Sequence, residues 1–113
     1  MRITFAVMTA ALLTLVGCAQ PRHPDTKIEC RFASPGYPAV SRAKKEEGTT
    51  EVRAVIDRDG QITNITITKS SGYERLDTAA LAAMRASACE PLYRNGERVP
   101  FSLRQPFRFA LTD

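Results

Sequence analysis

The last stretch of the chain restricts the fold more than any other feature of the sequence. Between positions 101 and 111 apolar and polar residues alternate. One parity holds Phe101, Leu103, Phe107, Phe109 and Leu111, and the other holds Ser102, Arg104, Pro106 and Arg108. Such alternation predicts a half-buried strand whose apolar side belongs to the core. Pro106 has no amide hydrogen for a ladder, so we expect this strand to lie at a sheet edge or to pass a bulge there.

Two earlier segments have the pattern of a hairpin. Residues 49–57 alternate and present one apolar side, which holds Val52, Ala54 and Ile56. Residues 58–60 supply a tight reversal, and residues 61–70 are rich in β-branched side chains. This arrangement predicts two antiparallel strands. The apolar parity slips within the second strand, which predicts a bulge near Thr63 and Asn64.

Two further segments have helical patterns. Residues 37–45 are expected to form about two turns, with Pro38 suited to the first turn. Residues 73–88 are rich in alanine along one stripe, which is typical of a helix lying close against a sheet. A chain of 113 residues is expected to hold one domain at most. The order of elements predicts an α+β fold, with two helices packed on one face of a three-stranded antiparallel sheet.

The first 17 residues have the composition of a secretory signal peptide. Arg2 precedes an apolar stretch, residues 3–16, that is shorter than the ~20 residues a transmembrane helix needs. The alternative is a permanent transmembrane anchor. The sequence Leu15-Val16-Gly17-Cys18 resembles the lipobox of bacterial lipoproteins. That resemblance implies a lipid on the Cys18 thiol and cleavage before it, although a simple signal peptide with a chance cysteine is also open.

The resemblance to lipoproteins also implies a location. Ala19 stands where an Asp typically retains lipoproteins at the inner membrane, so we expect a lipid-anchored protein on the periplasmic face of the outer membrane. We therefore divide the chain into a signal peptide, residues 1–17, a lipidated Cys18 with a flexible tether, residues 18–29, and a folded domain, residues 30–113. The tether is polar, holds two prolines and lacks periodicity.

Cys30 and Cys89 are the two cysteines of the predicted domain. An even pair in an exported protein favours a disulfide. The alternative is a free thiol at Cys30 and a small buried side chain at Cys89. We expect no metal site, because two isolated cysteines and His23 in the tether do not make a four-ligand set.

Several motifs, in this order and spacing, resemble the C-terminal domain of the TonB family of energy transducers. They are Tyr37-Pro38 with Ala43, Glu47-Gly48, Ile56-Asp57-Arg58-Asp59-Gly60, Lys69-Ser70-Ser71-Gly72, Leu76-Asp77-Thr78-Ala79-Ala80-Leu81, Pro91, Asn95-Gly96 and Phe107-Arg108-Phe109. The resemblance covers residues 37–111 and implies two helices beside a three-stranded antiparallel sheet. It also implies binding of an extended peptide from an outer-membrane transporter, which adds as a strand beside the last strand of the domain.

The sequence departs from a full TonB protein in its N-terminal part. It shows neither an inner-membrane helix that couples to a proton-driven motor nor a long proline-rich segment that crosses the periplasm. We therefore expect peptide or protein binding by strand addition, without energy transduction.

No constellation of residues predicts catalysis or a cofactor. The only histidine lies in the tether, and general acid-base chemistry needs positioned titratable groups. Asp57, Asp59 and Gly60 resemble the start of a calcium loop, but position twelve is Thr68 rather than Glu, so we expect a turn. Ser70-Ser71-Gly72 is likewise expected to end a strand.

The expected contact surface is the last strand, Phe101, Ser102, Leu103, Arg104, Gln105, Pro106, Phe107, Arg108, Phe109 and Ala110. Its partner is a segment of an outer-membrane or periplasmic protein, and a homodimer through the same edge is a further expectation. Arg98, Arg104 and Arg108 favour an acidic peptide, anionic lipid or peptidoglycan, whereas nucleic acid is not expected in this compartment. The alternative is a structural or inhibitory envelope lipoprotein that uses the same fold as a scaffold.

Overall fold

A computed structural model describes residue 17 and residues 27–111 of the chain. The apolar segment, residues 3–16, and the predicted lipidation site Cys18 lie outside the described residues. No helix within the described ranges has the length and apolar character needed to cross a membrane.

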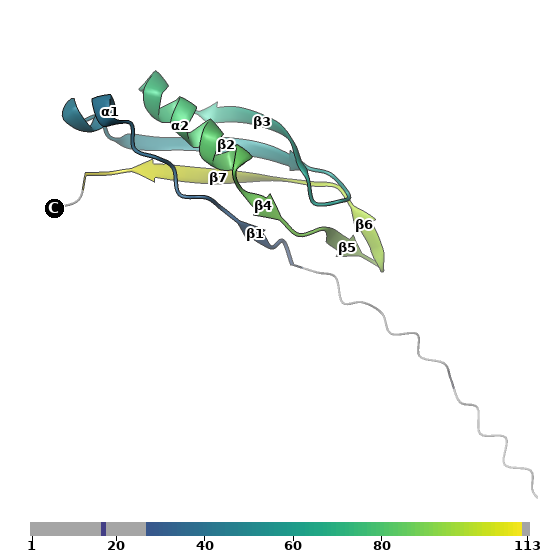
Figure 1. Cartoon of the computed structure of the whole chain (residues 1–113). Helices are drawn as coiled ribbons and strands as arrows, with labels where there is room; N and C mark the ends of the chain where they lie inside the picture. The colour runs from purple at the N-terminus through teal and green to yellow at the C-terminus, as the bar shows by residue number, and fades with distance from the viewer. Residues whose placement is uncertain (1–16, 18–26, 112–113) are drawn as a thin grey trace, which may run out of the picture.

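One layer of the fold is a three-stranded antiparallel sheet (Figure 1). Its strands are β2 (Gly48–Ile56), β3 (Ile62–Lys69) and β7 (Phe101–Phe109), in the order β3-β2-β7. Every second residue of β2 from Thr50 to Ile56 is buried, as the alternation predicted. The α+β class, with two helices and a three-stranded antiparallel sheet, is confirmed.

The pairing of β2 with β3 contains the predicted bulge. Val55 faces Asn64 and Ile56 faces Ile62, so Thr63 has no residue opposite it. Its hydroxyl donates instead to the carbonyl of Val55, at 3.1 Å. A second bulge leaves Thr68 unopposed, and its hydroxyl shares its proton between the carbonyl of Glu51, at 3.3 Å, and the carboxylate of Glu51, at 2.9 Å. Hydroxyl side chains thus supply donors where the ladder is interrupted.

Helices α1 (Ala39–Ala43) and α2 (Glu74–Arg85) lie on the same side of the sheet (Figure 1). Both are shorter than the sequence pattern predicted. The first ends where Lys45 adopts a left-handed conformation, with a φ of 54°. The second ends before residue 88 because Ala88–Cys89 forms a short strand, β4, which pairs with β1 (Cys30–Arg31).

The core lies between the helices and the sheet. It contains Val52, Ala54, Ile56, Leu76, Ala80, Ala83, Met84, Phe107 and Phe109. The buried alanines of α2 allow its backbone to approach the sheet. The large side chains that α2 itself buries are Leu76 and Met84. Full burial of one such large apolar side chain stabilises a fold by about 1.5–3 kcal/mol. Phe32, Tyr37 and Cys89 pack against this cluster from the segments that flank the helices.

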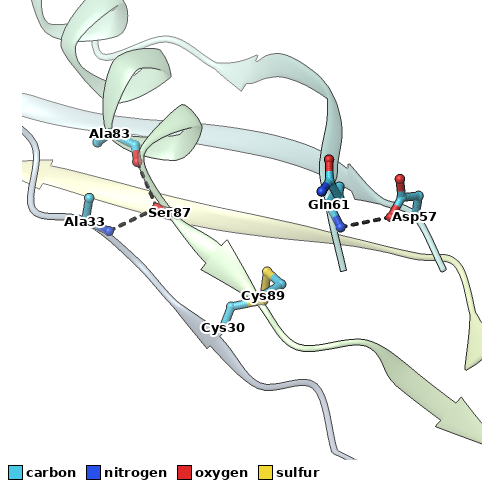
Figure 2. The surroundings of a disulfide bond; sticks show 7 residues. All are labelled: Cys30, Ala33, Asp57, Gln61, Ala83, Ser87 and Cys89. Atoms are coloured by element: carbon cyan, nitrogen blue, oxygen red, sulfur yellow. Dashed lines mark hydrogen bonds between the residues drawn. A yellow bond between two sulfur atoms is a disulfide. The ribbon is translucent and has the colours of Figure 1, made fainter. Parts of the chain in front are cut away.

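Cys30 and Cys89 face each other in the β1–β4 ladder and form a disulfide (Figure 2). Ser87 strengthens the same junction. Its hydroxyl donates to the carbonyl of Ala83 at 2.8 Å and accepts from the amide of Ala33 at 2.9 Å (Figure 2). Ser87 thus gives a hydrogen bond to a carbonyl in the last turn of α2 and holds the segment that enters the domain at Ala33.

A small hairpin, β5 (Leu92–Arg94) and β6 (Glu97–Val99), precedes the last strand. Its turn is the predicted Asn95-Gly96 pair, in which both residues have positive φ, 51° and 80°. Positive φ at two successive turn residues is the geometry that Asn-Gly favours in tight hairpins. The two flanking strands, of three residues each, were not predicted.

Candidate partner-binding edge

Strand β7 lies at an edge of the sheet. Within the described residues its one strand neighbour is β2. The register is regular over the whole strand, from Gly48 opposite Phe109 to Ile56 opposite Phe101. The strand therefore lies at an edge, as Pro106 predicted, and it passes no bulge there.

The backbone groups on the outer edge of β7, the side away from β2, can be assigned from the register. The carbonyls of Glu51 and Val55 accept hydroxyls of β3, so the odd-numbered residues of β2 turn their backbone groups toward β3. In an antiparallel pair these groups alternate between the two neighbours. The residues of β7 opposite the odd-numbered set, Ser102, Arg104, Pro106 and Arg108, therefore turn theirs to the outer edge.

Pro106 and Gln105 modify the middle of this edge. Because Pro106 belongs to the outward-turned set, its missing N–H removes no bond from the ladder with β2. Its carbonyl accepts the side-chain amide of Gln105, at 3.2 Å. The edge thus offers both an N–H and a C=O at Ser102 and at Arg104, on one side of Pro106, and at Arg108 on the other.

The two faces of β7 differ in cover. On the helix side Phe107 and Phe109 are buried, whereas Phe101, Leu103 and Gln105 are only half-buried. On the opposite side, which we call the open face, the even-numbered residues of β7 are exposed.

The open face is rich in cations. Arg104 lies directly opposite Arg53, and Lys69 lies opposite Glu51. Glu51 is the one acidic residue in strands β2, β3 and β7, and it lies on this face. Its Oε1 is 3.9 Å from the Nε of Arg104 and also accepts the hydroxyl of Thr68, at 2.9 Å. Like charges directly opposite each other destabilise a sheet, so this pairing favours a bound anion.

Arg98, predicted to belong with Arg104 and Arg108, lies elsewhere. Its guanidinium donates to the hydroxyl of Tyr93 at 2.9 Å and to Asp59 at 3.4 Å. The hydrogen bond to Tyr93 and the nearby Asp59 raise the pKa of Arg98. Arg98 therefore joins the β5–β6 hairpin to the β2–β3 turn.

The α1 segment holds the far end of β7 in place. The ring of Tyr37 packs edge-on against Phe109, with centroids 5.6 Å apart. The Tyr37 hydroxyl donates to the carbonyl of Glu46, and burial raises the pKa of Tyr37. Beyond the strand, the amide of Leu111 donates to the carboxylate of Glu47, at 2.7 Å.

The sequence profile of one family, described as the Gram-negative bacterial TonB protein C-terminal, matches residues 33–111. The chain belongs to the TonB C-terminal domain family. Members of this family are not enzymes, in agreement with the prediction of no catalytic activity.

Curated relatives and solved structures agree with this membership. Protein TonB of Neisseria meningitidis serogroup C is 39% identical over 49 residues, 43% of this chain and 18% of that protein. Protein TonB of Xanthomonas campestris pv. campestris is 31% identical over 77 residues, 68% of this chain and 34% of that protein. This TonB C-terminal domain chain thus spans about a third or less of its curated relatives.

The solution structure of the Pseudomonas aeruginosa TonB C-terminal domain has a TM-score of 0.65 and 26% identity, and covers 79% of this chain and 91% of that chain. A Helicobacter pylori TonB C-terminal domain has a TM-score of 0.52 and 26% identity, and covers 71% of this chain and 84% of that chain.

Asp77 organises the helix side of this TonB C-terminal domain. Its carboxylate accepts hydrogen bonds from the hydroxyl of Thr50 at 2.8 Å, from the amide and hydroxyl of Ser71 at 2.9 and 2.7 Å, and from the hydroxyl of Ser70. Burial would raise the pKa of Asp77, but the hydrogen bonds outweigh it and hold that pKa below its usual value. In the sequence Asp77 appeared only as part of the Leu76-Asp77-Thr78-Ala79-Ala80-Leu81 motif, because the contact with Thr50 depends on tertiary structure.

A bidentate ion pair joins the end of α1 to the start of α2. The guanidinium of Arg75 donates to both oxygens of Glu46, at 3.1 and 3.0 Å. The hydrogen bond to Arg75 is the main reason why the pKa of Glu46 lies below its usual value. The pair borders a surface cleft of about 590 Å³, which is also lined by Pro38, Tyr73 and Thr78.

The acidic turn has a structural role. The carboxylate of Asp57 accepts the amides of Asp59 and Gln61, both at 2.9 Å, and Figure 2 shows the second of these bonds. This is the turn chemistry expected of the Asp57-Arg58-Asp59-Gly60 sequence. Within the part of the chain that the structure describes, no group of three or more His, Cys, Asp or Glu side chains is arranged to hold a metal ion.

Proposed function

We propose that the chain is a lipid-anchored, TonB-like binding module of the periplasm. It recognises an extended segment of an outer-membrane or periplasmic protein, in association with outer-membrane transport. The observation that carries this proposal is the outer edge of β7. Its backbone groups at Ser102, Arg104 and Arg108 point away from β2, and no strand of the described residues pairs with them.

Strand addition uses this edge in a simple way. The main chain of the partner extends the ladder, and side-chain contacts on the two faces select its sequence. The proposed contact strand is residues 101–110, and its side-chain contacts come from Phe101, Ser102, Leu103, Arg104, Gln105, Pro106, Arg108 and Ala110, because the side chains of Phe107 and Phe109 are buried in the core. Each hydrogen bond of such a ladder contributes about 0.5–1.5 kcal/mol net. A few bonds at Ser102 and Arg104 do not offset the entropy lost on association by themselves, so side-chain contacts must contribute and the binding is expected to be weak and reversible.

Family membership supports the class of partner. TonB C-terminal domains bind TonB-box segments of outer-membrane receptors and work in the periplasm. We assign the same class of segment to this chain, because it retains the three-stranded sheet with the last strand at an edge.

The lipid anchor is the second part of the proposal, and it rests on Leu15-Val16-Gly17-Cys18. Residues 19–29 connect Cys18 to the domain and span at most ~35–40 Å when extended. A domain on such a tether meets partners close to the membrane that anchors it. Ala19 favours the periplasmic face of the outer membrane over retention at the inner membrane.

Two other uses of the fold remain to be separated from this one. A homodimer through β7 would bring Arg104 and Arg108 of both copies to one face of the joined sheet, and their repulsion opposes it. A structural or inhibitory envelope lipoprotein would keep the fold and leave the edge without a peptide partner.

The test is a peptide titration followed by NMR. The isotopically labelled full chain, in detergent micelles, is mixed with synthetic peptides that span TonB-box segments of outer-membrane receptors. We expect shifts of the β7 amides, largest at Ser102 and Arg104, and smaller shifts on β3 at the opposite edge of the sheet. Unchanged β7 amides at millimolar peptide would reject strand addition and favour the scaffold alternative.

A further inference from the structure

The register of the sheet indicates what the fourth strand should carry. Thr66 of β3, Arg53 of β2 and Arg104 of β7 lie in one row across the open face. We propose that the partner segment places a carboxylate directly opposite Arg104, with apolar side chains at its two neighbouring positions. This inference rests on the proposed function and specifies the chemistry of the segment that adds to β7.

The charges of the row call for an anion. Directly opposite side chains in an antiparallel pair have Cβ atoms about 4.5–5.5 Å apart, so the side chains of Arg53 and Arg104 leave the sheet beside each other. Glu51 neutralises these cations only in part, because its carboxylate lies 3.9 Å from Arg104 and also accepts the hydroxyl of Thr68. A carboxylate on a strand added to the outer edge would lie beside Arg104, within reach of its guanidinium. The Arg104 side chain is 67% exposed and free to turn toward it.

The backbone of the edge places this carboxylate at Arg104 rather than at Arg108. An added strand can pair with complete backbone groups at Ser102 and Arg104. At Pro106 it meets no N–H, and the carbonyl there is already bonded to the side chain of Gln105. The ladder is therefore continuous only along the first half of β7, and Arg108 lies beyond the interruption at Pro106.

The helix side of the same half favours apolar neighbours. Phe101 and Leu103 are only half-buried, whereas Phe107 and Phe109 farther along the strand are buried. Residues next to the carboxylate alternate to the helix side, where they would cover Leu103. The expected pattern is apolar, acidic, apolar. Each further Å² of apolar surface that this covers contributes about 25 cal/mol.

The experiment compares three peptides that differ at one position. The probes are Ser-Thr-Val-Glu-Val-Thr-Ser and its versions with Gln or Lys at the centre, all acetylated and amidated. Affinities for the full chain in micelles are read from the β7 amide shifts. We expect the Glu peptide to bind about fivefold more tightly than the Gln peptide, as an exposed ion pair allows, and the Lys peptide to bind least.

Substitutions of Arg104 test whether this side chain causes the preference for the Glu peptide. Arg104→Gln should remove the difference between the Glu and Gln peptides, and Arg104→Glu should reverse the order so that the Lys peptide binds best. Arg85→Gln, which removes an exposed cation of α2, is the matched control and should keep the preference. Arg104 is exposed, so its variants should fold, as the dispersion of their spectra would show.

The outcomes separate this inference from the proposed function. If all three peptides shift the β7 amides equally, strand addition holds and the acidic pattern is wrong. If none of them does and TonB-box peptides also fail, the proposed function is wrong and this inference with it. If Arg104→Gln instead weakens binding to phosphatidylglycerol vesicles while the peptides bind equally, the row contacts lipid and the inference is overturned.

Discussion

The carboxylate of Asp77, at the start of α2, accepts a 2.8 Å hydrogen bond from the hydroxyl of Thr50, a fully buried residue of β2. The same carboxylate accepts bonds from Ser70 and Ser71, which end β3. One side chain thereby joins the helix to two strands of the sheet. It also fixes the face of α2 that presents Leu76 to the core.

Replacement of Asp77 should destabilise the domain. Asp77→Asn keeps the size of the side chain but puts an amide donor where hydroxyl donors converge. Because a hydrogen bond to a charged group contributes about 1.5–3 kcal/mol, we expect a loss of about 2–3 kcal/mol. Urea unfolding followed by circular dichroism measures it. Thr50→Val should cost less in the Asp77→Asn background than in the wild-type chain, and additive losses would contradict the shared network.

The free energy of unfolding should fall in acid because the carboxylate of Asp77 becomes protonated. The pKa of Asp77 in the folded domain lies below its ordinary value of 3.8, so the unfolded chain binds more protons between the two values. The stabilisation is therefore complete above about pH 5 and is lost as the pH falls through the folded pKa. Glu46 contributes in the same direction. Unfolding free energies measured from pH 7 to pH 2 should show this decline, and Asp77→Asn should flatten it.

Reduction of the Cys30–Cys89 disulfide should weaken the domain. The two cysteines are 59 positions apart, and closing a loop of that size stabilises by about 4 kcal/mol in the chain-entropy account. A thermal melt with and without dithiothreitol measures the effect. The double variant Cys30→Ser, Cys89→Ser should melt at the temperature of the reduced chain and ignore the reductant. Equal melting of the oxidised and reduced chains would show that the bridge contributes little.

Loss of Cys18 should release the protein from the membrane. Cys18→Ser removes the thiol that the lipobox resemblance assigns to the lipid. We expect no incorporation of labelled palmitate and a shift of the chain from the membrane fraction to the soluble fraction of the periplasm. Unchanged fractionation and labelling would overturn the lipoprotein assignment. Gln20→Ala, which leaves Cys18 and both cysteines of the disulfide in place, is the control and should stay membrane-bound.

Pro106 should limit pairing of the edge with the wrong partners. Pro106→Val restores an N–H at the outer edge and raises strand propensity, so self-association of the chain should increase. Sedimentation velocity at high salt, where arginine repulsion is screened, should detect the increase. A wild-type and a variant chain that sediment alike would mean that Pro106 does not protect this edge.

Much of the fold follows from local pattern. The alternation of residues 49–57 and 101–111 predicted the central strand and the edge strand, and the parity slip predicted the bulge at Thr63. The β1–β4 ladder was missed because strands of two residues have no period to detect. The end of α2 was placed too late because the pattern of alanines continues beyond Arg85 into β4.

The candidate edge was predicted only in part. Pro106 indicated an edge strand, and a family resemblance gave that edge a role. The opposition of Arg53 and Arg104 depends on the register between strands 51 positions apart along the chain, which no local pattern contains. The bond from Gln105 to the carbonyl of Pro106 depends on the rotamer of one side chain.

The disulfide also determines how the domain would bear mechanical load. In the anchored protein that we propose, a pull between the membrane and a strand held at β7 enters through Cys30. It crosses the sulfur atoms to Cys89 and continues along residues 90–100 to β7, through covalent bonds alone. The segment between the two cysteines, which holds both helices and the first two strands of the main sheet, is bypassed. Oxidised, the domain would transmit tension without unravelling that segment, and only the β5–β6 hairpin lies in the path of the load.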